Sequence, residues 1–264
     1  MQVQSRDVLA SMIEAVQGRE ARHHRAVTTG LPAPLDQLCC GMLHEWCGDS
    51  SPMPPGRGGW AAPILLLAHL ARRSDRGLII WIGRKLWPQP WVLVRRGFHQ
   101  TDDLLRRSVL IDPPNMNDRL WAIDLCLRSA AVGAVVADAG GTTLVHSRRM
   151  QLAAEAGEAL ALLARPAREL ATASAAAMRW RVGPIVSPES QPRWRVELVR
   201  CKAVQQWSGK EAATSLVLEH DRATGDLRVP AALVDRPGSA SIEQEQEQRW
   251  EPTRSTFPSS RRAG

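Results

Sequence analysis

The segment that decides the fold runs from residue 41 to residue 70. It begins Met42-Leu43-His44-Glu45-Trp46-Cys47, continues Gly48-Asp49-Ser50-Ser51-Pro52-Met53-Pro54-Pro55-Gly56-Arg57-Gly58-Gly59, and ends Trp60-Ala61-Ala62-Pro63-Ile64-Leu65-Leu66-Leu67-Ala68-His69-Leu70. This order predicts a short strand, a glycine-rich turn and an apolar helix. In α/β proteins such a turn is where a phosphate group usually binds, because the free N–H groups at the start of the helix attract an anion.

The turn lacks the residues that a working phosphate loop needs. Such a loop ends in Gly-Lys-Ser/Thr, where the lysine reaches the outer phosphates and the hydroxyl holds magnesium. No lysine occurs between Met1 and Arg84, and Trp60 stands where the hydroxyl is required. Three prolines also remove N–H groups from the turn. We therefore interpret it as a degenerate phosphate loop without ATP or magnesium, formed by Gly48, Gly56, Arg57, Gly58 and Gly59.

Composition favours a folded protein that works in a reducing compartment. The chain has 264 residues with 44% hydrophobic content, a formal net charge of +7 and five cysteines without a Cys-x-x-Cys pair. These counts favour buried thiols over a disulfide framework, and His44 and Cys47 alone do not predict a metal site. The positive charge fits either an ordinary solvated surface or an acidic partner such as nucleic acid. No apolar run is long enough to cross a bilayer, which predicts a cytoplasmic protein without membrane contact.

Apolar runs alternating with helical patterns predict an α/β fold with a mainly parallel central sheet. We expect a short strand at residues 42–47 and buried strands at 78–83, 108–112, 134–138 and 159–164. Asn117-Asp118 and Thr142 or Thr143 are predicted to cap the helices that follow the strands at 108–112 and 134–138. After Pro166 the pattern changes to a period of two, which predicts antiparallel strands at 178–182 and 193–200 and a hairpin at 216–229.

The same patterns divide the chain into three parts. Residues 1–29 are predicted as an N-terminal helical segment, since Val8, Met12 and Val16 recur at helical spacing. Residues 30–234 form the predicted core. Residues 235–264 are rich in Ser, Gln, Glu and Arg and poor in apolar side chains, which predicts a disordered tail.

Two arginine-bearing strands form the strongest candidate for a binding surface. Arg179 and Arg181 alternate with Trp180 and Val182, and Arg193 and Arg195 alternate with Trp194 and Val196. If the strands are neighbours, four guanidinium groups share one face, which would contact DNA phosphates or a partner protein. Arg200 and Lys202 extend this candidate surface. The alternative is a solvated face with both tryptophans packed in the core.

Several of these features together resemble the ImuA family of RecA-like proteins. In the first half of the chain they are Leu31-Pro32, Leu35-Asp36, Leu43-His44-Glu45 and the leucine-rich helix after the loop. In the second half they include the segment Ser147-Arg148-Arg149-Met150-Gln151-Leu152-Ala153-Ala154-Glu155. The sequence Arg-Trp-Arg-Val also occurs twice, at 179–182 and 193–196, and the second copy is followed by Glu197-Leu198-Val199-Arg200. The resemblance covers residues 30–230. It implies a RecA-like (P-loop NTPase type) core without an intact nucleotide site and a role in SOS-induced, error-prone translesion DNA synthesis. The partners it implies are an ImuB-like Y-family polymerase homologue, an error-prone DnaE-type polymerase and RecA, with DNA as a further candidate.

Three functions remain open on the sequence. Because no catalytic constellation is present, a non-catalytic accessory protein is the leading hypothesis. Asp138 ends a buried strand where a magnesium-linked aspartate belongs, but we interpret it as a cap or turn residue. Where an active recombinase has a catalytic glutamate after the second strand, this chain reads Gly83-Arg84-Lys85. The alternatives are a DNA-stimulated ATPase in which Arg57 replaces the lysine, and a SulA-like inhibitor of cell division.

Overall fold

The computed structural model describes residues 25–48, 64–74, 77–89, 92, 103–185, 192–202, 215–221 and 226–230. The chain divides into one unit from Met1 to Val229 and a second unit from Pro230 to Gly264, close to the predicted start of the tail. Residues 1–24, Gly56 to Gly59 and the predicted tail lie outside the described residues, so the predictions made for them stay predictions.

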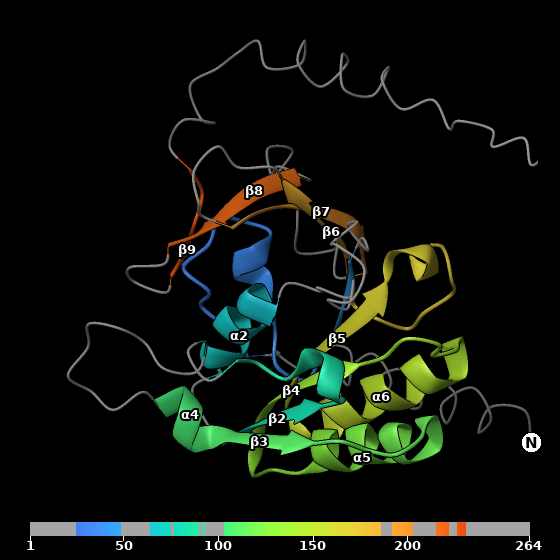
Figure 1. Cartoon of the computed structure of the whole chain (residues 1–264). Helices are drawn as coiled ribbons and strands as arrows, with labels where there is room; N and C mark the ends of the chain where they lie inside the picture. Colours follow the sequence, from blue (N-terminus) through green and yellow to red (C-terminus); the bar gives the residue numbers. More distant parts are fainter. Residues whose placement is uncertain are drawn as a thin grey trace, which may run out of the picture. The chain divides into compact units, whose positions relative to one another are not determined.

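A single nine-stranded sheet organises the first unit, with the strand order β3-β2-β4-β5-β1-β6-β7-β8-β9 (Figure 1). The strands are β1 (Leu43–Gly48), β2 (Leu78–Ile82), β3 (Ser108–Ile111), β4 (Val132–Asp138), β5 (Leu160–Pro166), β6 (Met178–Ile185), β7 (Arg193–Cys201), β8 (Ser215–His220) and β9 (Leu227–Arg228). β1 to β6 pair in parallel, whereas β7, β8 and β9 pair antiparallel. The predicted α/β class, with a mainly parallel sheet and antiparallel C-terminal strands, is therefore confirmed.

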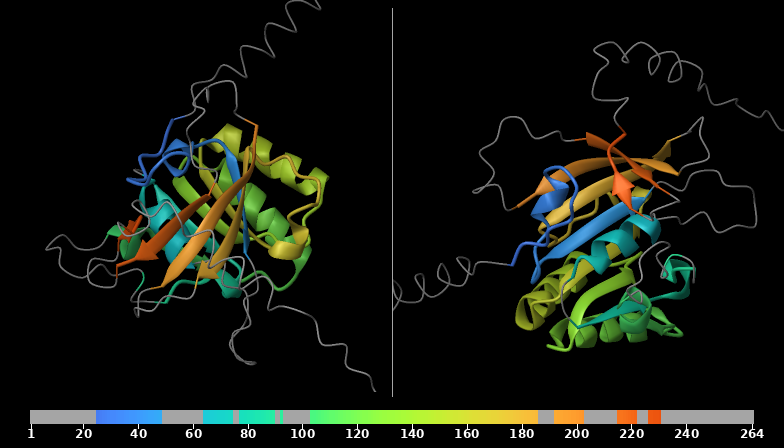
Figure 2. Two further views of the ribbon diagram at one scale, coloured as in Figure 1. Left: turned by 90° about the horizontal axis from the view of Figure 1, so that it is seen from above. Right: turned by 90° about the vertical axis from the view of Figure 1, so that its left-hand side faces the viewer.

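Helices cover both faces of the parallel strands (Figures 1 and 2). The helices are α2 (Ile64–Arg72), α4 (Asp103–Arg107), α5 (Met116–Arg128) and α6 (Leu144–Gly157), and the 3-10 turns are η1 (Leu35–Gln37), η2 (Arg84–Leu86) and η3 (Ala167–Glu169). On one face, α2 and the segment around η1 pack on Trp46 and Trp81. On the other face, α5 and α6 pack on Leu43, Val135 and Leu163. The two apolar clusters follow from the alternation of side chains along each strand.

Two tryptophans fix the junction between the parallel strands and the antiparallel extension. Trp46 on β1 lies opposite Trp180 on the neighbouring β6, and their rings stack with centroids 5.2 Å apart and an interplanar angle of 4°. Trp180 and Trp194 are both buried, as the core alternative predicted. Stacked aromatic pairs contribute about 0.5–1.5 kcal/mol beyond the area that they bury.

Three local predictions differ from the structure. β3 is an edge strand with Val109 39% and Leu110 44% exposed, so it is not covered on both faces. Asn115, rather than Asn117-Asp118, caps α5, because its side chain accepts the N–H of Asp118 at 3.0 Å. Residues 25–29 are not helical, and Ala26 forms an antiparallel bridge with Cys39.

The predicted cap of α6 and the free state of the cysteines agree with the structure. Thr143 caps α6 in a reciprocal arrangement with His146. All five cysteines are free thiols. Within the described residues, no cluster of three or more His, Cys, Asp or Glu side chains is placed to hold a metal ion. No helix in the described part of the chain has the length and apolar character needed to span a membrane.

Candidate functional site

The carboxyl ends of β1 and β5 form the place where an open α/β sheet usually binds its ligand. After β1 the chain continues towards β2 on one side, and after β5 it continues to β6 on the other. Ligands bind at such a reversal of direction. Gly48, the first residue of the predicted phosphate loop, is the buried last residue of β1. The strand that precedes the predicted turn therefore ends at this edge of the sheet, and the turn itself stays a prediction.

A buried ionic network lies beside these strand ends. Glu45 on β1 is completely buried between two arginines from the neighbouring strands. Arg165 on β5 donates to one carboxylate oxygen at 2.9 Å, and Arg179 on β6 donates to the other at 2.6 Å. Ser174 Oγ donates to Glu45 at 2.7 Å. Two guanidinium groups thus share one carboxylate, and each must find a further acceptor in the interior.

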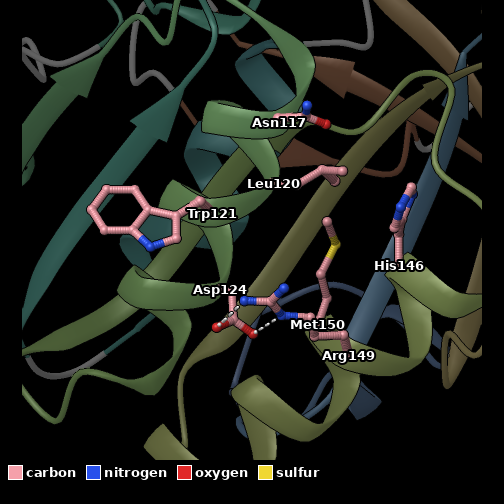
Figure 3. Close-up of a pocket in the computed structure, with 7 residues that line it drawn as sticks. All are labelled: Asn117, Leu120, Trp121, Asp124, His146, Arg149 and Met150. Carbon is pink, nitrogen blue, oxygen red and sulfur yellow. Dashed lines mark hydrogen bonds and ion pairs between the residues drawn. The ribbon is translucent and has the colours of Figure 1, made fainter.

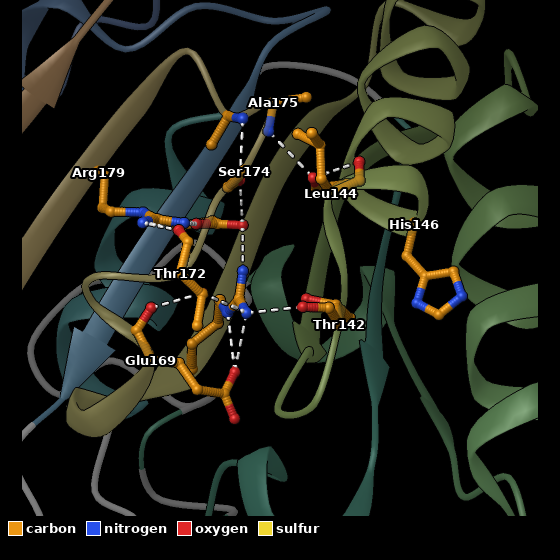
Figure 4. A network of polar contacts seen from close by, with 12 residues as sticks. Thr142, Leu144, His146, Glu169, Thr172, Ser174, Ala175 and Arg179 are labelled. Atoms are coloured by element: carbon orange, nitrogen blue, oxygen red, sulfur yellow. Dashed lines mark hydrogen bonds and ion pairs between the residues drawn. The ribbon is translucent and has the colours of Figure 1, made fainter.

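Most of those acceptors come from the segment that follows β5, and one comes from Thr142 before α6 (Figure 4). Arg165 also donates to Glu169 at 2.9 Å and to the carbonyl of Thr142 at 2.8 Å. Arg179 donates to the carbonyls of Leu170 and Thr172. Burial alone would lower the pKa of Arg165, but the attraction of Glu45 and Glu169 outweighs it and raises that pKa. The network therefore attaches η3 and the residues after it to the strand ends.

The carboxylate of Asp138, at the end of β4, accepts hydrogen bonds from other groups of the protein. Its side chain is buried, and one oxygen accepts from Arg119 of α5 at 3.0 Å. The other oxygen accepts the N–H of Gly140 at 3.1 Å. The interpretation of Asp138 as a turn residue is confirmed, and its partner is a guanidinium group.

The two arginine-bearing strands are neighbours, as predicted, but their arginines have different surroundings. β6 and β7 pair antiparallel, with Arg181 opposite Glu197 and the two joined by an ion pair of 3.0 Å. Arg193 pairs with the buried carboxylate of Glu219 on β8, and Arg195 is exposed. Arg179 is buried in the Glu45 network, so its predicted place on a shared surface is wrong.

Arg200 and Lys202 lie next to the buried network. Arg200 donates to the carbonyl of Ser174 at 2.6 Å, and Lys202 donates to that of Ala175 at 3.0 Å. Both side chains hold the segment that carries Ser174 in place. Binding of DNA or a partner by Arg181, Arg193, Arg195, Arg200 and Lys202 stays a prediction.

The Ser147 to Glu155 segment, on which the family resemblance depends, has an inner and an outer side. Ser147 accepts the N–H of Ala175 at 3.0 Å. Gln151 accepts the N–H of Leu43 at 3.0 Å and donates to the carbonyl of Gly41 at 3.2 Å. Gln151 thus attaches α6 to the start of β1, and Ser147 attaches it to the segment before β6. Arg148, Arg149 and Leu152 are exposed on the outer side.

A pocket between α5 and α6 was not predicted from the sequence (Figure 3). Its volume is about 240 Å³, and it is lined by Asn117, Leu120, Trp121, Asp124, His146, Arg149 and Met150. Asp124 accepts from Arg149 at 3.0 Å and from Arg128 at 3.1 Å. Burial raises the pKa of Asp124, but these hydrogen bonds outweigh burial and leave the pKa below its usual value. The carboxylate is therefore ionised at neutral pH.

Comparison with known proteins points to one family, although no protein-family model matches the chain. Protein ImuA from two strains of Caulobacter vibrioides, NA1000 / CB15N and ATCC 19089 / CIP 103742 / CB 15, is 31% identical to this chain over 161 residues. The match covers 54% of this chain and 64% of each relative, so the chain spans slightly less than two thirds of the relatives' length. This similarity confirms the resemblance that the sequence motifs indicated and supports membership of the ImuA family.

Proposed function

We propose that this protein is a non-catalytic accessory protein of the ImuA/ImuB mutagenesis system. It holds partner proteins together during error-prone translesion DNA synthesis after DNA damage. The similarity to Protein ImuA carries this proposal. Its partners are an ImuB-like Y-family polymerase homologue, a DnaE-type polymerase and RecA, and its core is a RecA-like fold with a degenerate phosphate loop.

Two features of the strand ends support a holding function. The Glu45 network fills the interior beside the carboxyl ends of β1 and β5 with the protein's own guanidinium groups. Asp138, the candidate for a magnesium-linked carboxylate, is already paired with Arg119. A nucleotide cycle would need Asp138 released from this pair, whereas a protein that holds partners benefits from a rigid sheet edge.

Co-purification tests the proposal directly. The tagged full chain is expressed in damaged cells, and its ImuB-like and RecA partners are sought by immunoblotting. We expect at least the ImuB-like protein to co-purify with the chain and the damage-induced mutation frequency to fall when the gene is deleted. Recovery of neither partner, or an unchanged mutation frequency, would contradict the proposal. Filamentation on overexpression without any effect on mutation frequency would favour the SulA-like alternative.

Nucleotide binding separates the accessory function from the ATPase alternative. Isothermal titration of the purified chain with Mg-ATP is expected to show no saturable binding at micromolar concentrations. Micromolar binding that Arg57→Ala abolishes would favour the ATPase alternative, because Arg57 is the residue that would replace the missing lysine.

A further inference from the structure

The outer sides of α5 and α6 form an exposed apolar surface, here named the α5–α6 surface. It carries Trp121 (61% exposed), Leu125 (52%), Leu144 (49%), Val145 (75%) and Leu152 (43%). These are five of the ten large apolar side chains that are strongly exposed in the described part of the chain. Apolar side chains gathered in this way mark an interaction site more often than scattered ones do.

The pocket between the two helices gives this surface a place for an anchor. Leu120 and Met150 supply its apolar lining, and Asn117, His146 and Arg149 lie around them (Figure 3). Its volume of about 240 Å³ is below the roughly 300–1,000 Å³ of small-molecule sites. The pocket therefore suits a single side chain of a protein partner better than a nucleotide.

Arginines are the main charged groups near the middle of the surface. Asp124 is shared by two guanidinium groups, those of Arg128 and Arg149. Arg148 forms no hydrogen bond or ion pair with any residue that the structure describes, and it is exposed. Arg148 also lies close to Lys202. Burial lowers the pKa of Lys202 most, and the positive charges of Arg200 and Arg148 lower it further.

The other acidic groups of the two helices lie near the helix ends. Asp118 lies at the start of α5 and accepts from Asn115 at 2.8 Å, and Glu155 lies near the end of α6 and accepts from Gln151 at 2.9 Å. A second copy of the chain docking through the same surface would add its own Arg148 and Arg149 to the interface. Charge complementarity therefore favours a different, acidic partner.

We propose that the α5–α6 surface binds an amphipathic, acidic helix of a partner protein. Apolar residues at positions i, i+3 or i+4, and i+7 of that helix contact Val145, Leu152 and Trp121, and one of these partner side chains occupies the pocket. Glutamate or aspartate residues beside them pair with Arg148 and Arg149. This inference rests on the proposed function, because it assigns a surface through which the chain holds its partners.

The test uses the full chain and two probes, the ImuB-like protein and a synthetic helical peptide with leucines at i, i+3 and i+7 flanked by glutamates. Val145→Asp combined with Leu152→Asp is expected to weaken both interactions at least about tenfold. Arg148→Glu should weaken peptide binding and reduce its dependence on salt. Replacing the peptide's glutamates with lysine should abolish binding. Affinities are measured by fluorescence anisotropy, and circular dichroism checks that the variants are folded.

Matched control variants come from α4, beside the edge strand β3. Leu105→Asp is made at a leucine that is 49% exposed, and Arg106→Glu at an exposed arginine one position later. Both should leave the two affinities unchanged. If the control variants weaken binding as much as the α5–α6 variants do, the inference is overturned.

The outcomes separate this inference from the proposed function. If the ImuB-like protein binds the wild type and the α5–α6 variants equally, and the acidic peptide does not bind, the surface assignment is overturned and the function stands. If the ImuB-like protein does not bind but the peptide binds in an α5–α6-dependent way, the surface stands and that partner is wrong. A homodimer that dissociates in the Val145→Asp, Leu152→Asp variant, measured by light scattering, would show that a second copy occupies the surface and would overturn the inference.

Discussion

At the scale of single residues, one buried carboxylate beside the strand ends is shared between two arginines. Glu45, Arg165 and Arg179 come from three adjacent strands and are all buried. A buried ion pair of this kind is weak evidence for stability by itself, because desolvation offsets much of the attraction. Removal of the central carboxylate is different, because it leaves Arg179 without its carboxylate partner and Arg165 with Glu169 alone.

The first prediction concerns this carboxylate. Glu45→Gln keeps the size of the side chain but removes its charge, so we expect a loss of about 3–5 kcal/mol in the free energy of unfolding. Urea denaturation monitored by circular dichroism measures it. Glu197→Gln serves as the control, because the exposed pair of Glu197 with Arg181 should contribute less than about 1 kcal/mol. Equal effects of the two substitutions would show that the buried network does not hold the strands together.

The second prediction concerns pH and His69 of α2. Burial lowers the pKa of this histidine to about 4, and its ring bonds to the carbonyl of Thr29 at 3.2 Å. In the unfolded chain its pKa is near 6.5, so between about pH 6.5 and pH 4 the unfolded state binds more protons than the folded state. The contribution of His69 to the free energy of unfolding should be constant above about pH 6.5. It should fall as the pH decreases from about 6.5 to 4, by up to about 3 kcal/mol.

A substitution isolates the contribution of His69. His69→Gln keeps an N–H donor for Thr29 but cannot be protonated in this range. Because burial also lowers the pKa of His44 to about 4, the variant should lose about half of the pH dependence rather than all of it. Urea denaturation at pH 7 and pH 5 measures this difference. A variant with the same dependence as the wild type would contradict the assignment.

At the scale of elements, the contact between α5 and α6 depends on a glycine. A Cβ atom at Gly157 would lie 2.0 Å from the carbonyl oxygen of Leu127 and 2.8 Å from the carbonyl carbon of Arg128. The end of α6 therefore lies directly against the backbone of α5. This close approach fixes the two helices that carry the α5–α6 surface.

The third prediction is that Gly157→Ala destabilises the protein. Alanine in a helix is about 1 kcal/mol more favourable than glycine, but the clash with backbone atoms should cost more, giving a net loss of about 1–3 kcal/mol. Thermal unfolding followed by circular dichroism measures the net effect. Ala156→Gly at the adjacent exposed position is the control and should lose about 1 kcal/mol through helix propensity alone. Stabilisation by Gly157→Ala would mean that the helices are not packed this closely.

Periodicity was enough to predict most of the elements. Continuous apolar runs predicted the buried strands β2, β4 and β5, and the strand–turn–helix order predicted β1. Period-two alternation predicted the antiparallel strands and offered the burial of Trp180 and Trp194 as the alternative to a shared arginine surface. The same reasoning was wrong for β3, because composition does not tell an edge strand from a central one. It also moved the cap of α5 by two residues, since Asn115 and Asn117 are chemically equivalent candidates.

The candidate site was harder to predict because its contacts are distant in the sequence. Alternation placed Arg179 on one side of β6 but did not show what covers that side, and its partner Glu45 is 134 residues away. The α5–α6 surface had a weaker signal in the sequence. Val145 and Leu152 are seven residues apart in α6, on the side opposite the inward-facing Ser147 and Ala154.

At the scale of the whole molecule, the described strands have two distinct parts. The parallel strands are covered by helices on both faces, and the antiparallel strands extend the sheet with exposed ion pairs such as Arg181–Glu197. A covered parallel sheet is rigid, and surfaces on its helices can hold partners without a change of shape. We therefore predict an assembly that does not depend on a bound nucleotide.

The most direct test is the affinity of the full chain for the ImuB-like protein, measured with and without Mg-ATP in the same titration. We predict that the complex forms in both conditions and that the two affinities agree within about twofold, which corresponds to negligible coupling between nucleotide and partner. A complex that forms only with Mg-ATP, or whose affinity changes more than about tenfold on its addition, would contradict the account.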